Sequence, residues 1–204
     1  MATLIRDPRI EEEVLSDRRA KGLDRWDEVW EGVYVMAPYP NNEHQVIQAK
    51  LVTILQTVVG WDGGDEVCAG VNVSDREVDW RENFRCPDVA LFLRGTRAQN
   101  RGAFWLGGPD FAIDIVSPEE SSRDKLEFYA KVGVRELLIV DRAPWQLEFY
   151  RLAGNQLVQS GMSSTNTPET LASKVVPLSF RMIVGGARPS IEVTHCDAVQ
   201  RWVV

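Results

Sequence analysis

The stretch from Phe111 to Asp141 has the pattern of a strand, a crossover helix and a second strand, and it limits the fold more than any other part of the sequence. Apolar runs over 111–116 and 136–141 are short and nearly continuous, as in buried strands. Between them, apolar residues recur every three to four positions, which predicts a helix over 119–132 that ends at Gly133. Such a unit favours parallel strands and a right-handed crossover. With a hairpin predicted after Asp141, the sequence indicates an α/β fold around a central mixed sheet.

A carboxylate lies within the first of these strands. Asp114 stands between Ile113 and Ile115, and burying a carboxylate is unfavourable unless it is paired, hydrogen-bonded or bound to a metal. One explanation is a structural partner elsewhere in the sheet. The other is a divalent cation shared with Asp88, which opens a further apolar strand over 89–93. Mg²⁺ takes hard oxygen ligands and often uses one or two carboxylates, with waters and a substrate phosphate completing its shell.

Four short motifs follow one another in a fixed order along the chain. They are Pro87-Asp88-Val89, the run 113–118, the run 125–134 and the run 138–141. Together they resemble the Uma family of restriction-endonuclease-like proteins, which belong to the PD-(D/E)XK nuclease superfamily. The resemblance covers roughly residues 26–151. It implies a restriction-endonuclease-like core, with a central mixed β-sheet flanked by helices, and hydrolysis of phosphodiester bonds in nucleic acid.

The same resemblance implies roles for five residues. Asp88 and Asp114 would hold Mg²⁺ or Mn²⁺, and Lys125 would orient or activate the attacking water. His44 lies in the first turn of a helix predicted over 43–59, where family members often carry a histidine near the nuclease site. Glu31 occupies the position of an acid that precedes this histidine. For His44 and Glu31, a helix-start polar residue and a solvated turn carboxylate are the structural alternatives.

Two departures from the family pattern lie close to the expected site. Most members carry Glu where this chain has Asp114, and the usual lysine position two residues later is Val116, so that the ammonium must come from Lys125. These departures leave a second function open, that of a non-catalytic interaction or scaffold protein that retains the nuclease fold.

The formal net charge of −7 counts against tight binding of nucleic acid by the whole surface, because phosphate contacts depend on clustered lysines and arginines. A loop over 94–108 carries Arg94, Arg97 and Arg101 with no acidic residue. We expect these arginines to bind nucleic acid, with DNA as the expected substrate, if their loop overhangs the two carboxylates. A solvated glycine-rich loop is the structural alternative.

The 204 residues are expected to form one domain. It would comprise an N-terminal helical element over 1–25 with a helix over 8–21, a core over 26–151 and a β-rich C-terminal extension over 152–204. The three cysteines are widely spaced and form no Cys-x-x-Cys pair, which favours a reduced, cytoplasmic compartment. No apolar run is long enough to span a membrane.

A homodimer is expected for two reasons. The apolar segments 33–36 and 147–150 are candidates for sheet edges that a partner chain covers, and dimerisation is the habit of the family that the sequence resembles.

Overall fold

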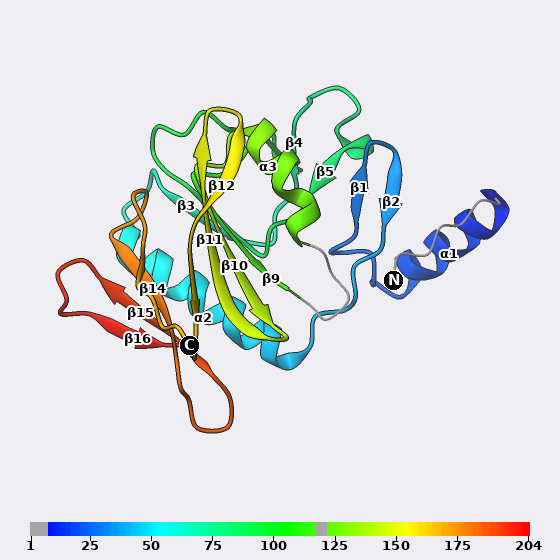
Figure 1. The fold of residues 1–204 in the computed structure, drawn as a ribbon. Helices are drawn as coiled ribbons and strands as arrows, with labels where there is room; N and C mark the ends of the chain where they lie inside the picture. Colours follow the sequence, from blue (N-terminus) through cyan, green and yellow to red (C-terminus); the bar gives the residue numbers. More distant parts are fainter. Residues whose placement is uncertain (1–7, 117–121) are drawn as a thin grey trace.

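The computed structural model describes residues 8–116 and 122–204 (Figure 1). The α-helices in these parts are α1 (Pro8–Ala20), α2 (Asn42–Val59) and α3 (Leu126–Val132), and two short 3-10 helices are η1 (Trp80–Glu82) and η2 (Ser122–Lys125). No helix in this part of the chain is long and apolar enough to cross a membrane.

The central sheet has the strand order β12-β11-β10-β9-β6-β3. Its strands are β3 (Glu66–Ala69), β6 (Val89–Phe92), β9 (Phe111–Ile115), β10 (Glu136–Arg142), β11 (Trp145–Ala153) and β12 (Gln156–Ser164). Strands β9 and β10 run parallel, with Phe111 opposite Glu136, and the other neighbours in this sheet are antiparallel. The predicted mixed sheet and its parallel strand pair are therefore confirmed.

Two further sheets flank this one. The second sheet, in the order β2-β1-β5-β4-β8-β7, contains β1 (Glu28–Trp30), β2 (Val33–Val35), β4 (Val73–Ser74), β5 (Phe84–Arg85), β7 (Gln99–Asn100) and β8 (Trp105–Leu106). The third sheet contains β13 (Leu171–Ala172), β14 (Leu178–Ile183), β15 (Ser190–His195) and β16 (Arg201–Val203). The third sheet confirms the predicted β-rich C-terminal extension.

Helices α2 and α3 bury apolar side chains against opposite faces of the central sheet (Figure 1). The Asn41 side chain caps α2 by accepting a hydrogen bond from the backbone N–H of His44, and the helix buries Ile47, Leu51 and Leu55. On the other face, α3 buries Phe128 and Tyr129. The expected start of this second helix at residue 119 lies outside the described residues, and its first described turn is the 3-10 helix η2, a geometry common at helix ends.

The third sheet shares the α2 side of the core. Phe180 of β14 lies 5.8 Å from Phe111 and 6.3 Å from Phe149, measured between ring centroids. Leu178, Met182 and the buried residues of β15 continue the same apolar cluster. The C-terminal extension is thus packed directly on the central sheet.

One of the two expected sheet edges is not an edge. The segment 147–150 lies in β11, which pairs with β10 on one side and with β12 on the other. The second partner, β12, is largely exposed and has a mixed sequence of polar and apolar residues, so no buried strand pattern marks it. The segment 33–35 does form the outer strand of the second sheet, and Val33 is exposed there.

Replacement of Phe180 by Ala should lower the free energy of unfolding by about 3–5 kcal/mol, because it removes a ring that joins the two apolar surfaces. Thermal unfolding should remain a single transition, since the extension and the core share this cluster. Val184→Ala, at an exposed position in the loop after β14, is the matched control and should have little effect. Separate transitions for the extension and the core would contradict a single domain.

Candidate active site

The pairing of β6 with β9 brings two carboxylates to the same end of the central sheet. Ala90 lies opposite Ala112 and Val89 lies opposite Ile113, so the next step of this antiparallel register sets Asp88 opposite Asp114. The Asp88 carboxylate accepts a hydrogen bond of 2.7 Å from the backbone N–H of Ile115, which fixes it against the end of β9. Opposite residues of an antiparallel pair lie close together on one face.

Helix α2 holds Asp88 from a second direction. His44 Nε2 lies 3.1 Å from Asp88 Oδ1, and the Gln48 side chain donates a 2.7 Å hydrogen bond to the Asp88 carbonyl oxygen. His44 and Gln48 are one helical turn apart, so both face the strand end. His44 is buried, and its Nδ1 atom has no hydrogen-bond partner among the described residues.

Asp114 is almost completely buried, with 1% of its surface exposed. The Tyr129 hydroxyl, from α3, lies 3.1 Å and 3.2 Å from its two carboxylate oxygens and donates to them. Burial raises the pKa of Tyr129 well above its usual value, and the negative charge of Asp114 raises it further. The phenol therefore stays protonated as a hydrogen-bond donor over the ordinary pH range.

Lys125, at the end of η2, is buried between two acids. Its Nζ atom lies 3.0 Å from Glu28 Oε1 and 3.8 Å from Asp114 Oδ2. Sequence reasoning missed Glu28. A signal was available, because Glu28 directly precedes the apolar residues Val29 and Trp30, much as Asp88 directly precedes an apolar run.

A second buried cation lies behind this lysine. The Arg85 guanidinium is stacked between Trp30 and Phe128, at 4.4 Å and 4.2 Å from their ring centroids. Burial lowers its pKa, yet arginine remains charged in proteins. The charge of Glu28 acts on this guanidinium and raises its pKa against the effect of burial.

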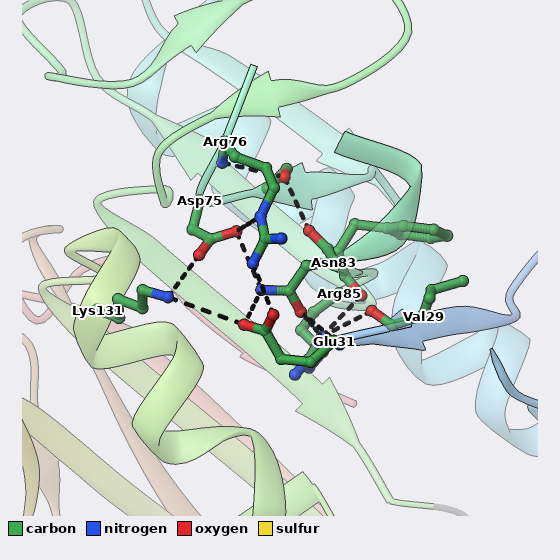
Figure 2. A network of polar contacts seen from close by, with 9 residues as sticks. Val29, Glu31, Asp75, Arg76, Asn83, Arg85 and Lys131 are labelled. Atoms are coloured by element: carbon green, nitrogen blue, oxygen red, sulfur yellow. Dashed lines mark hydrogen bonds and ion pairs between the residues drawn. The ribbon is translucent and has the colours of Figure 1, made fainter. Parts of the chain in front are cut away.

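Glu31 contacts neither aspartate nor Lys125 within the described residues. Figure 2 shows its carboxylate in contact with Arg76 at 2.7 Å and with Asn83 at 2.8 Å, and Asn83 in turn accepts a 3.1 Å hydrogen bond from Arg85. Lys131, near the far end of α3 from Lys125, lies 3.9 Å from Glu31 and 2.6 Å from Asp75. Glu28, three residues earlier, makes the contact with Lys125 instead.

The three loop arginines are also remote from the two carboxylates. Arg94 follows the other end of β6, six residues beyond Asp88, which corresponds to about 20 Å along an extended strand. Its side chain donates to the carbonyl oxygen of Gly63. Arg101 follows β7, the outermost strand of the second sheet, where it contacts Glu77. Arg97 is exposed in the same loop, and the contacts given above for Arg94 and Arg101 do not involve Asp88 or Asp114.

No group of three or more His, Cys, Asp or Glu side chains arranged to hold a metal occurs within 8–116 and 122–204. Among these residues, the β6–β9 register offers a metal two carboxylates, and Mg²⁺ is often bound by one or two carboxylates with waters and substrate phosphate.

The model of a known protein family, Uma2, matches residues 19–184 of this chain. The chain belongs to the Uma2 family. The family carries the description "Putative restriction endonuclease", and the match includes the whole arrangement of Glu28, His44, Asp88, Asp114 and Lys125.

A solved structure shows the same fold. It is the crystal structure of a protein from Anabaena variabilis described as a "putative nuclease belonging to DUF820", with a TM-score of 0.56 and 18% sequence identity. The alignment covers 70% of the present chain and 79% of the Anabaena chain. A comparison with curated proteins gave no match. The restriction-endonuclease-like fold expected from the sequence is confirmed, and the family description supports a nuclease.

Removal of the Tyr129 hydroxyl in Tyr129→Phe should lower the free energy of unfolding by about 1–2 kcal/mol at neutral pH, because buried Asp114 loses a donor. The raised pKa of Tyr129 gives this difference a pH dependence. The contribution is complete below the unfolded-state value of about 10 and is lost as the pH rises above it.

The unfolding temperatures of the wild type and Tyr129→Phe should therefore converge between about pH 9 and pH 11. Tyr39→Phe, which alters an exposed tyrosine, is the control and should track the wild type throughout. A constant difference between the wild type and Tyr129→Phe at all pH values would contradict the assignment of this hydrogen bond.

Proposed function

We propose that this Uma2 protein is a metal-dependent endonuclease that hydrolyses phosphodiester bonds, with Asp88 and Asp114 as the metal ligands and Lys125 and His44 as further catalytic-site residues. The observation that carries the proposal is the β6–β9 register, which sets two carboxylates opposite each other beside a buried lysine.

The donor set fits Mg²⁺ or Mn²⁺. Both acids offer the hard oxygen atoms that these ions prefer. A bound divalent ion would supply Lewis-acid stabilisation of the charge that develops on the scissile phosphate.

The side chains of the protein have separable roles in this proposal. Lys125 lies on the Asp114 side of the site, where its ammonium can orient the attacking water or donate to a phosphate oxygen. His44 and the Ile115 amide hold the Asp88 carboxylate in one orientation. Tyr129 does the same for Asp114. Groups held in this way need little rearrangement when the substrate arrives.

The proposed substrate is duplex DNA, and Arg94, Arg97 and Arg101 are proposed to contact its backbone away from the cleavage point. A separation of about 20 Å corresponds to about six base pairs at 3.4 Å each. The loop would therefore contact only substrates that extend well beyond the scissile bond. We also propose a homodimer that forms through β2, whose outer edge is unpaired among the described strands.

Asp88→Asn should abolish both cleavage of DNA and the rise in unfolding temperature caused by Mg²⁺ or Mn²⁺, because it keeps the shape of the side chain and removes the charge that a hard cation requires. Asp62→Asn makes the same change in an exposed loop and should leave both properties intact. Retention of ion-dependent stabilisation by Asp88→Asn would exclude Asp88 as a ligand.

Replacement of Arg94, Arg97 and Arg101 by Ala should flatten the salt dependence of binding by about two to three units of slope on a 20-base-pair duplex. On a duplex of about six base pairs the same variant should bind like the wild type, since the loop lies beyond its end. Titrations with Ca²⁺ in place of Mg²⁺ suppress cleavage during the measurement. An unchanged slope on the long duplex would show that the loop does not contact DNA.

A further inference from the structure

Glu28 makes a closer ion pair with Lys125 than Asp114 does, although Glu28 lies outside the β6–β9 pair that brings the two aspartates together. Its Oε1 atom lies 3.0 Å from Lys125 Nζ, whereas Asp114 lies 3.8 Å away. Glu28 is 4% exposed. Its position in β1 thus brings the second sheet into the site.

The Glu28 carboxylate is itself held on both oxygens. Oε1 accepts a 2.8 Å hydrogen bond from the backbone N–H of Cys86, and Oε2 accepts a 2.7 Å hydrogen bond from the indole of Trp30. Cys86 lies two residues before Asp88, so one fixed carboxylate contacts both the segment that leads to one proposed metal ligand and the lysine beside the other. Such fixed contacts favour a defined geometry over simple charge neutralisation.

A lysine ammonium and a divalent cation have conflicting requirements at Asp114. Both are attracted to the same carboxylate, and they repel each other at short distance in a buried site. A lysine that relied on Asp114 alone would compete with the metal for it. A second carboxylate on the far side of the ammonium removes this competition.

We infer that Glu28 is a positioning residue that holds the Lys125 ammonium beside Asp114, so that Lys125 and a divalent cation can occupy the site together. This inference rests on the proposed metal-dependent function. Glu28 acts through Lys125 and does not contact the metal itself.

The test is a double-mutant cycle measured by calorimetric titration with Mn²⁺ alone, on the wild type, Glu28→Gln, Lys125→Met and the double variant. Gln keeps an acceptor oxygen for the Cys86 amide and removes the charge. Glu28→Gln should weaken Mn²⁺ binding about tenfold, because the lysine then turns to Asp114, whereas in the Lys125→Met background the same change should have an effect of less than about twofold. Thermal unfolding without metal checks that each variant is folded.

Trp30→Phe provides a second variant that leaves every charge in place. It removes the indole donor to Glu28 but keeps an aromatic ring over Arg85. It should weaken Mn²⁺ binding in the same direction, by about threefold, and only when Lys125 is present.

The possible outcomes separate this inference from the function on which it rests. If Glu28→Gln weakens binding equally in both backgrounds, Glu28 acts only as a nearby charge and the inference is overturned. A larger loss in the Lys125→Met background would make Glu28 a metal ligand, which also overturns it. If the wild type binds no Mn²⁺ at all, the proposed metal-dependent function fails first.

Discussion

The buried carboxylate of Asp114 is the constraint on which the rest of the site depends. A charge with 1% of its surface exposed must be compensated within the protein. Tyr129 donates to it from α3, and Lys125 approaches it from η2. The segment 122–132 must therefore lie against this face of the sheet. Glu28 in turn balances the positive charge of Lys125, which this segment brings into the core.

Ion pairs fix the segment that carries Lys125 and Tyr129 at both ends. Before the lysine, Arg123 bridges Asp141 of β10 and Glu148 of β11. After the tyrosine, Lys131 binds Asp75 at 2.6 Å in the network of Figure 2. Each exposed pair adds little stability by itself. Together they limit the positions available to the segment, which is the property that a preorganised site requires.

The sequence predicted the elements whose apolar pattern is local. The parallel pair β9–β10 and the Asn41-capped helix α2 follow from periodicity and capping within short windows. The two aspartates could be recognised individually, because an acid inside or at the start of an apolar strand is unusual. Their position opposite each other could not be predicted, because it depends on the register between β6 and β9, and no local pattern determines that register.

The remaining features depend on tertiary placement. Glu28 reaches the site because β1 pairs with β5, and β5 leads into Pro87 and Asp88. Glu31 lies in the turn between β1 and β2 and contacts Asn83 instead. The position of Arg94 follows from chain direction alone: Asp88 directly precedes β6 and Arg94 follows its end, so the two lie at opposite ends of one strand.

Crystals grown with Mn²⁺ provide the most direct measurement of whether Asp88 and Asp114 form one metal site. An anomalous difference map should show a single Mn²⁺ peak with a carboxylate oxygen from each aspartate at about 2.1 Å and with Lys125 still in contact with Glu28. Absence of a peak between the two aspartates, at a Mn²⁺ concentration that supports cleavage of DNA, would contradict the metal-dependent site described above.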